Sequence, residues 1–193
     1  MAWVEKNFKL VGVAPLIMSD GKMADPLDPA SKSLAQVTRK SKKTDADYEE
    51  AARREWFGRL YTKDVDGKRR VCIPERVIDG LTVEGAKKLR MGPMAKSGVY
   101  CKSCAPLIYD GPEDIEDLWK RGKNRITVGV RNQKARVMRT RPIFPQWTAA
   151  ITLEYDDEQI NESSLKDILS AAGKMSGIGD WRPRYGRFGV VAT

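Results

Sequence analysis

The side chains best suited to bind another molecule lie near the C-terminus, in the sequence AAGKMSGIGDWRPRYGRFGVV of residues 171–191. Its five glycines permit positive φ angles and close backbone approach, and its arginines carry planar forks of donors that suit phosphate. Trp181 and Tyr185 add aromatic faces on which bases can stack. This combination favours a loop that binds an anion. The alternative is a plain turn, with Gly173 ending a helix and the arginines in solvent.

A second candidate surface is the basic segment of residues 120–141, KRGKNRITVGVRNQKARVMRTR. It holds nine cations and no acid, which equals the formal net charge of +9 of the whole chain, so the excess charge is local. Cations on both arms of an expected hairpin form an extended positive surface that attracts polyanions, although a merely solvated basic face is the alternative. The strand-like alternation favours nucleic acid over a membrane surface.

Three segments supply the residues that we expect to contact nucleic acid. The candidates are Arg39, Lys40, Lys42 and Lys43 at the end of residues 18–43; Arg125, Arg131, Lys134, Arg136, Arg139 and Arg141 in the basic segment; and Lys174, Gly177, Gly179, Arg182, Arg184, Gly186 and Arg187 in the glycine-rich loop. Neutralisation of phosphates is the main term in binding of this kind.

Catalytic residues are harder to find. The chain has no histidine, which removes the commonest general acid or base and the commonest metal ligand. Asp20, Asp25 and Asp28 are weak candidates for a metal-dependent ribonuclease, and solvated loop aspartates are the alternative. A lone carboxylate near a phosphate needs a metal or a second group, and the sequence offers no such partner. We therefore expect a protein that is not an enzyme.

The three cysteines, Cys72, Cys101 and Cys104, bear on cofactors and location. An odd count argues against a full disulfide framework and favours a reducing cytoplasm. The CxxC of Cys101 and Cys104 lacks the four ligands of a structural zinc site, so we expect neither a metal nor a cofactor. No apolar run approaches the ~20 residues of a membrane span, and we expect no membrane partner.

Periodicity and capping patterns predict the elements that position these residues. Thr44 and Asp47 form an N-terminal capping pattern. Gly80 and Gly85 weaken the helix propensity of a later helix, and close packing against a neighbour is one explanation for them. We expect strands over residues 8–17, 125–130, 135–138, 147–154 and 187–192, a short strand pair over 99–101 and 106–109, and helices over 45–61, from 73–75 to 89, over 113–119, and from Asn161 or Ser163 to Gly173.

The order of these elements predicts the fold. The expected order is strand, helices, strands, helix and strand. This order suits an α+β, ferredoxin-like (RRM-like) βαββαβ core. We expect a single domain over residues 1–193, with residues 18–43 and 91–112 as insertions. Residues 18–43 show no period and predict a long excursion with a basic end.

The segment TRPIF of residues 140–144, the AAG of residues 171–173 and the following GIGDWRPRYGRFGV resemble the RAMP superfamily of CRISPR-associated proteins. The similarity is to Cas-seven-like backbone subunits, especially small stand-alone versions in phages and mobile elements. It implies a subunit that polymerises along RNA, gripping it with a basic palm while an inserted thumb reaches the next subunit. The resemblance carries over to Gly177, Gly179, Arg182, Arg184, Gly186 and Arg187.

These observations lead to one favoured function and two alternatives. We expect a non-catalytic subunit that binds single-stranded nucleic acid, RNA favoured, beside copies of itself in a CRISPR-related or counter-CRISPR complex. The resemblance also extends to relatives that cut RNA with an aspartate of an N-terminal loop, which keeps the ribonuclease alternative open. The other alternative is a phage single-strand-binding or structural protein.

Overall fold

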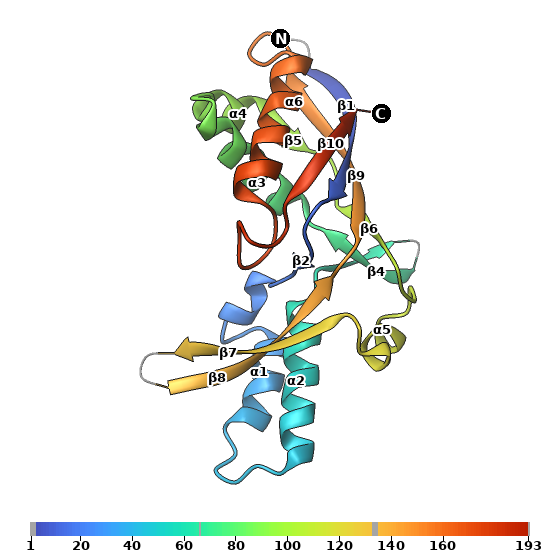
Figure 1. The fold of residues 1–193 in the computed structure, drawn as a ribbon, viewed down its shortest axis with the longest axis vertical. Helices are drawn as coiled ribbons and strands as arrows, with labels where there is room; N and C mark the ends of the chain where they lie inside the picture. The colour runs from blue at the N-terminus through green and yellow to red at the C-terminus, as the bar shows by residue number, and fades with distance from the viewer. Residues whose placement is uncertain (1–2, 66, 133–134, 193) are drawn as a thin grey trace.

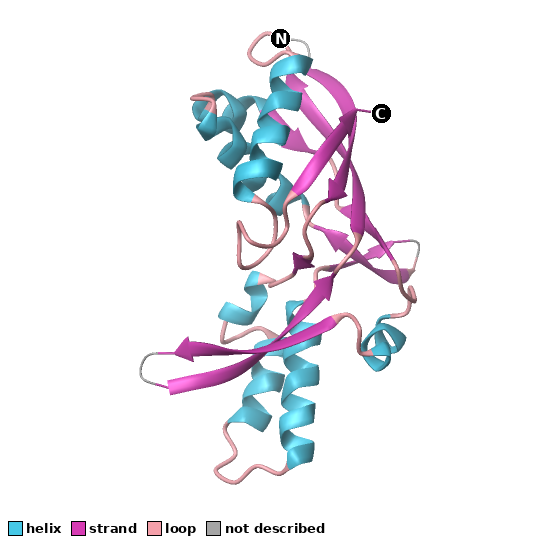
Figure 2. Ribbon diagram, in the orientation of Figure 1, coloured by secondary structure: helices cyan, strands magenta, loops and turns pink. Residues whose placement is uncertain are grey.

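A long sheet runs through the upper part of an elongated molecule, and a separate β-hairpin crosses a pair of helices below it (Figure 1). The computed structural model describes residues 3–65, 67–132 and 135–192. Both strands and helices occur in each part (Figure 2). The α+β class predicted from the sequence is therefore confirmed.

The strand pairs of the described residues are antiparallel. The larger sheet has the order β10-β1-β9-β6-β4-β3 with β5 also paired to β9, and a smaller sheet has the order β2-β8-β7. The strands are β1 (Trp3–Gly12), β2 (Leu16–Ile17), β3 (Thr62–Val65), β4 (Lys68–Ile73), β5 (Val99–Cys101), β6 (Ala105–Tyr109), β7 (Arg125–Asn132), β8 (Ala135–Phe144), β9 (Trp147–Asp156) and β10 (Phe188–Ala192).

Helices cover one face of the larger sheet and form most of the lower part. They are η1 (Gly21–Ala24), α1 (Pro29–Thr38), α2 (Asp45–Arg59), α3 (Glu75–Lys88), α4 (Gly92–Gly98), α5 (Ile115–Arg121), α6 (Glu162–Ala171) and the π-helical turn η2 (Ala172–Ser176). None of the helices in the described ranges is long and apolar enough to cross a membrane.

The core lies between the larger sheet and helices α3 and α6, and it continues into the lower part through Trp56 of α2, Leu118 of α5 and Phe144 of β8. Alternation along β1 buries Phe8 and Leu10 on the helix side and exposes Asn7 and Lys9 on the other. The two helices approach each other closely at Gly85, where an added Cβ would press on the carbonyl oxygen of Ile168. The close packing considered for Gly80 and Gly85 is confirmed at Gly85 but not at Gly80, where nothing lies within 4 Å of an added Cβ.

Local capping predictions also hold. The Thr44 hydroxyl accepts a hydrogen bond from the backbone N–H of Asp47, whose carboxylate accepts one from the Thr44 N–H, which completes a capping box. A hydrogen bond from Lys40, followed by those from Thr44, lowers the pKa of Asp47 to about 2. Helix α6 begins after Asn161, one of the two predicted caps.

Several predictions of element bounds and pairing are corrected by the structure; the strand expected over 135–138, for example, is β8 and runs to Phe144. Residues 18–43 are not irregular throughout, because they contain η1 and α1. The first predicted strand is interrupted after β1 and resumes as β2. Strands β5 and β6 both occur, but each pairs with β9 and not with the other. Gly173 does not end its helix: the π-helical turn continues to Gly177, which has a φ of 71°.

Candidate nucleic-acid interface

The β7–β8 hairpin presents two unlike faces. Residues opposite each other in an antiparallel pair share a face, so Arg125, Arg131 and Arg136 lie on one side with Thr127 and Met138. All five are exposed, and this outer face contains no acid. Lys134, the remaining cation predicted near the tip, lies outside the described residues. The outer face is therefore a ladder of exposed arginines.

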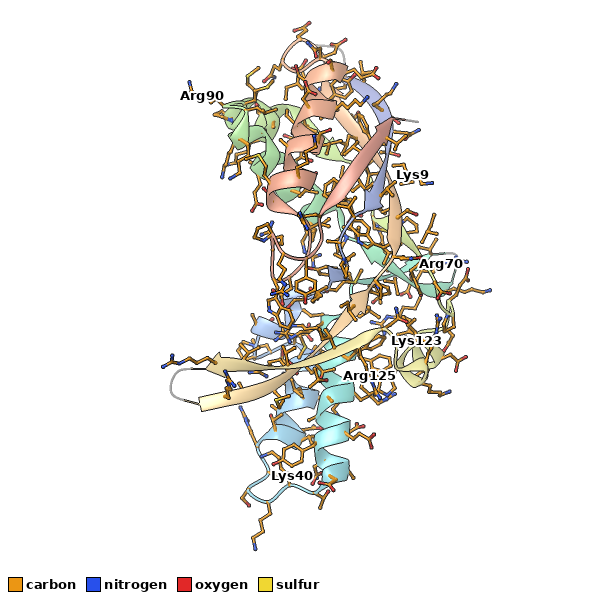
Figure 3. All side chains as sticks on the ribbon, viewed as in Figure 1. Lys9, Lys40, Arg70, Arg90, Lys123 and Arg125 are labelled. Atoms are coloured by element: carbon orange, nitrogen blue, oxygen red, sulfur yellow. The ribbon has the colours of Figure 1, made fainter. Side chains whose placement is uncertain are left out.

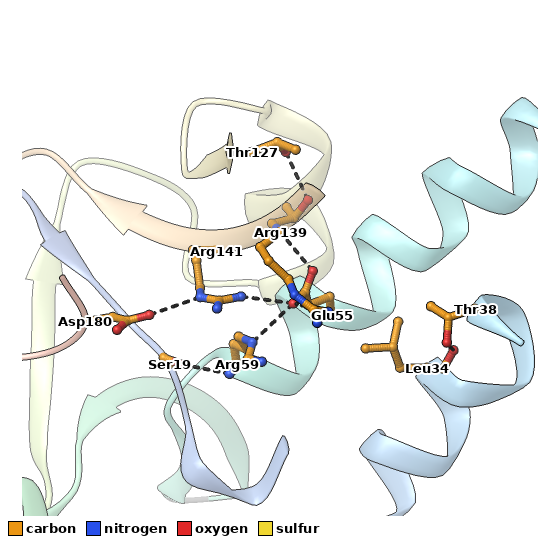
Figure 4. Close-up of polar contacts among 10 residues, drawn as sticks. Ser19, Leu34, Thr38, Glu55, Arg59, Thr127, Arg139, Arg141 and Asp180 are labelled. Carbon is orange, nitrogen blue, oxygen red and sulfur yellow. Dashed lines mark hydrogen bonds and ion pairs between the residues drawn. The ribbon is translucent and has the colours of Figure 1, made fainter. Parts of the chain in front are cut away.

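The inner face of the hairpin directs its arginines into the protein. Arg141 is buried, and its Nη1 donates to Glu55 of α2 at 2.9 Å (Figure 4). The same carboxylate accepts the backbone N–H of Thr140 at 2.9 Å and lies 3.5 Å from Nη1 of Arg139. Arg139 and Arg141, both predicted to contact nucleic acid, therefore fix the hairpin to helix α2.

Arg59 completes the cluster around Glu55. Its Nε lies 3.4 Å from the Glu55 carboxylate, and its Nη1 donates to the hydroxyl of Ser19 at 2.7 Å. Burial, and then the positive charge of Arg141, lowers the pKa of Arg59. Three guanidinium groups thus converge on one buried carboxylate, which compensates charges that would be costly to bury alone.

The same cluster reaches the glycine-rich loop through Asp180. Nε of Arg141 donates to the Asp180 carboxylate at 3.1 Å, while the Asp180 N–H donates to the carbonyl of Ile17 at 2.8 Å. The loop is thereby joined to β2, and to β8 by the Arg141–Asp180 contact that Figure 4 shows. Glu55 and Asp180 were not predicted as site residues, because their partners are far away in the sequence.

Glycines in this loop are required by its packing. Gly179 has a φ of 88° and Gly186 a φ of 72°, and an added Cβ would press on the carbonyl of Ile17 or Ile178 respectively. Trp181 also has a positive φ, of 54°, and packs edge-on against Tyr185. The glycines predicted to approach a ligand therefore approach the protein's own backbone.

The cations of the loop differ in their surroundings. Arg182 is paired with Glu84 of α3 at 2.7 Å, an acid that sequence reasoning did not connect with the loop. Lys174, Arg184 and Arg187 are exposed, and in the described part of the chain they form no ion pair. These three side chains form a second exposed basic surface, on the loop.

The basic end of residues 18–43 lies at the tip of the helical part, where Lys40 is labelled in Figure 3. Lys40 pairs with Asp47 at 2.6 Å, and Nζ of Lys43 donates to the Lys40 carbonyl at 2.8 Å. Arg39 and Lys42 are exposed. This end is therefore partly neutralised.

Arg125 lies where strand β7 of the hairpin begins (Figure 3). Its guanidinium carbon lies 4.6 Å from the centre of the Trp119 ring, within the range of a cation–π contact. Trp119 in turn packs against Trp56, whose indole N–H donates to the carbonyl of Asn124 at 2.8 Å. The aromatic cluster holds Arg125 in place while leaving its outer side exposed.

The three candidate aspartates stabilise local structure. Asp20 caps η1 and pairs with Arg76 at 3.0 Å, and Asp28 caps α1 by accepting the N–H of Ala30 at 2.7 Å. Asp25 accepts the N–H of Leu27. Among the described residues, no group of three or more histidine, cysteine, aspartate or glutamate side chains is placed to hold a metal ion.

The three cysteines are buried free thiols. Burial, then the neighbouring Cys104, raises the pKa of Cys72 to about 12, and burial raises that of Cys101 to about 11. Thiols in this state are weak nucleophiles, because the thiolate is the reactive form. Cys101 belongs to the hydrophobic core, and Cys72 and Cys104 are also buried.

Comparison with known proteins adds no family assignment: no protein-family model matches the chain, and no curated protein is significantly similar to it.

Proposed function

We propose that the protein is a non-catalytic subunit that binds single-stranded nucleic acid, with RNA favoured. The observation that carries this proposal is the outer face of the β7–β8 hairpin, where Arg125, Arg131 and Arg136 are exposed and no acid is present. The cations on the inner face already have Glu55 as a partner. The outer arginines face solvent, and guanidinium forks are well suited to phosphates.

The glycine-rich loop supplies a second contact surface through Lys174, Arg184 and Arg187. Arg141 joins this loop to the hairpin through Asp180, so the two basic surfaces are held in a defined relation. A binding surface that is ordered before its ligand arrives loses less entropy on binding. This connection supports a continuous path for a strand across loop and hairpin.

The topology supports a ferredoxin-like core as part of the proposal. Strands β1, β5, β9 and β10 with helices α3 and α6 follow the order βαββαβ along the chain, and the strands lie in the order β10-β1-β9-β5. We infer that these elements correspond to the palm of the RAMP-like subunits that the sequence resembles. Helices α1 and α2 and the hairpin then form the projecting part that reaches a neighbouring copy.

Nucleic acid that copurifies with the protein tests the binding proposal. We expect protein purified at low salt to show a raised ratio of absorbance at 260 nm to that at 280 nm. Ribonuclease should remove this signal and deoxyribonuclease should not. Protein that is free of nucleic acid and also fails to bind an added RNA oligonucleotide at low salt would contradict the proposal.

A cleavage assay separates the proposal from the ribonuclease alternative. End-labelled RNA incubated with the protein and magnesium should stay intact. Magnesium-dependent cleavage that disappears in Asp20→Ala, Asp25→Ala or Asp28→Ala would show that the subunit is an enzyme.

A further inference from the structure

A cavity of about 1000 Å³ lies outside the hairpin and the glycine-rich loop. Its walls come from η1, α1, α2, the β3–β4 pair and the start of α5. Arg70, one of its lining residues, lies at the right of the molecule in Figure 3, whereas strands β7 and β8 extend to the left. Six cations line the cavity: Lys22, Arg53, Arg54, Lys68, Arg69 and Arg70.

Three of these cations are neutralised by carboxylates that also line the cavity. The ion pairs join Arg53 to Glu116 at 2.6 Å, Arg54 to Glu50 at 2.7 Å, and Arg70 to Glu113 at 3.4 Å. The fourth lining acid, Asp114, caps its own helix by accepting the N–H of Asp117. The paired arginines therefore add little net charge to the cavity.

Six cations against four acids leave the lining an excess of two positive charges, which the other three cations supply. Lys68 is exposed and forms no ion pair within the described ranges, and Arg69 donates Nε to the neutral hydroxyl of Thr62 at 3.1 Å. Lys22 lies 3.9 Å from Asp20, at the limit of an ion pair. Lys68 and Arg69 come from β4 and Lys22 from η1, so the excess charge comes from two walls of one cavity.

The cavity also has ordered donors and an apolar part. Nη2 of Arg53 donates to both oxygens of Glu116, and its guanidinium lies 4.7 Å from the centre of the Phe57 ring. These contacts fix the guanidinium of Arg53. Its Nε and Nη1 donate no hydrogen bond to Glu116. Phe57, Leu60 and Ile115 supply apolar lining.

We propose that this cavity binds a nucleotide unit, with its phosphates on Lys68, Arg69 and Lys22 and its sugar and base toward Phe57, Leu60 and Ile115. The phosphates of a nucleotide carry several oxygens, so they can contact cations from two walls of the cavity at once. A ligand with a single carboxylate cannot do so. The volume is that of a site for a compound of nucleotide size. The unit is either a free nucleotide or part of a strand, since both present the same phosphate chemistry.

Binding of three probes by the full chain tests the inference: ATP, inorganic triphosphate and a single-stranded RNA 12-mer. We expect the double variant Lys68→Gln/Arg69→Gln to weaken the binding of ATP or of the 12-mer at least tenfold. Both side chains are exposed, so thermal stability should not change. The matched control is Lys96→Gln/Lys166→Gln, which removes the same charge from exposed positions on α4 and α6.

The outcomes separate the two sources of phosphate. Saturable ATP binding that the variant loses supports a free nucleotide, whereas loss of 12-mer binding alone supports a strand. No saturable binding of ATP or the 12-mer, an equal loss in the control, or triphosphate binding as tight as that of ATP would overturn the nucleotide site.

The cavity and the hairpin can also fail separately. The variant Arg131→Ala/Arg136→Ala leaves the cavity intact, so it should reduce RNA binding and leave ATP binding unchanged. If it reduces neither while the cavity variant reduces ATP binding alone, the proposed RNA binding by the hairpin fails and the cavity inference stands.

Discussion

Glu55 is the residue on which the lower part of the molecule most depends. It lies on α2, is almost fully buried, and compensates Arg59, Arg139 and Arg141 together. Removal of one partner of a buried ion pair leaves an uncompensated charge in a place that water cannot reach. The position of the hairpin on α2 follows from this one carboxylate.

We predict that Glu55→Gln lowers the free energy of unfolding by about 3 kcal/mol, because the buried charge of Arg141 loses its main partner. Chemical denaturation measures the change. The matched control is Glu116→Gln, whose partner Arg53 is partly exposed, and which should cost less than about 1 kcal/mol. Equal effects of the two substitutions would show that the Glu55 cluster does not hold the hairpin.

The glycine-rich loop gives a second prediction for single residues. Gly186→Ala should destabilise the protein by about 1–3 kcal/mol, because a Cβ at its φ of 72° is strained and presses on the Ile178 carbonyl. Gly189→Ala should have almost no effect, since nothing lies within 4 Å of an added Cβ there. Thermal unfolding of both variants measures the difference. A Gly186→Ala variant as stable as Gly189→Ala would mean that the loop adopts another conformation.

The raised pKa of Cys72 predicts that the protein becomes less stable at alkaline pH. Burial raises its pKa from 9.0 to about 12, so above pH 9 the unfolded chain loses a proton that the folded chain keeps. Stability from this group is complete below pH 9 and decreases as the pH rises toward 12, by on the order of 1 kcal/mol at pH 10. Denaturation at pH 8 and pH 10 should show a smaller decrease in Cys72→Ala. An identical decrease in both proteins would contradict the assignment.

Residues with local partners were predictable, and those with distant partners were not. The capping box of Thr44 and Asp47 spans three positions, and its pattern is visible in the sequence. Glu55 and Arg141 are 86 positions apart, and only the fold brings them together. An acid in a strongly charged helix gave no sign that it would be buried.

At the scale of elements, the hairpin was recognised because its alternation and its cations lie close together in sequence. Its two faces were not separated, since alternation alone does not say which face meets α2. Helix α1 was missed although Asp28 caps it and Pro29 begins it, because it has only ten residues and buries only Val37. Strands β5 and β6 were located, but their shared partner β9 depends on the whole sheet.

The division of the hairpin into two faces leads to a comparison of matched double variants. Arg131→Ala/Arg136→Ala should weaken single-stranded RNA binding and lower the slope of log affinity against log salt by about 1.4, with thermal stability unchanged. Arg139→Ala/Arg141→Ala removes the same charge from the inner face and should chiefly lower stability. Fluorescence anisotropy and thermal melts measure the two effects. If the inner pair sets the salt slope instead, the wrong face was assigned to RNA.

At the scale of the molecule, the sequence indicated an α+β chain with a local excess of positive charge, and both are present in the structure. It did not indicate how the charge is divided between exposed arginines and a buried cluster. That division depends on where the hairpin crosses α2 and where the glycine-rich loop meets β8 (Figure 1). The proposed function predicts an assembly in which copies of the protein lie side by side along one nucleic-acid strand.

The most direct test of the central claim is the affinity of the intact protein for a labelled single-stranded RNA 30-mer, measured by anisotropy from low to high salt. We predict tight binding at low salt and a linear fall of log affinity with log salt, with a slope of about −0.7 for each phosphate contacted. An affinity that does not change with salt, or no binding at the lowest salt, would contradict the claim that the exposed arginines of the hairpin bind nucleic acid.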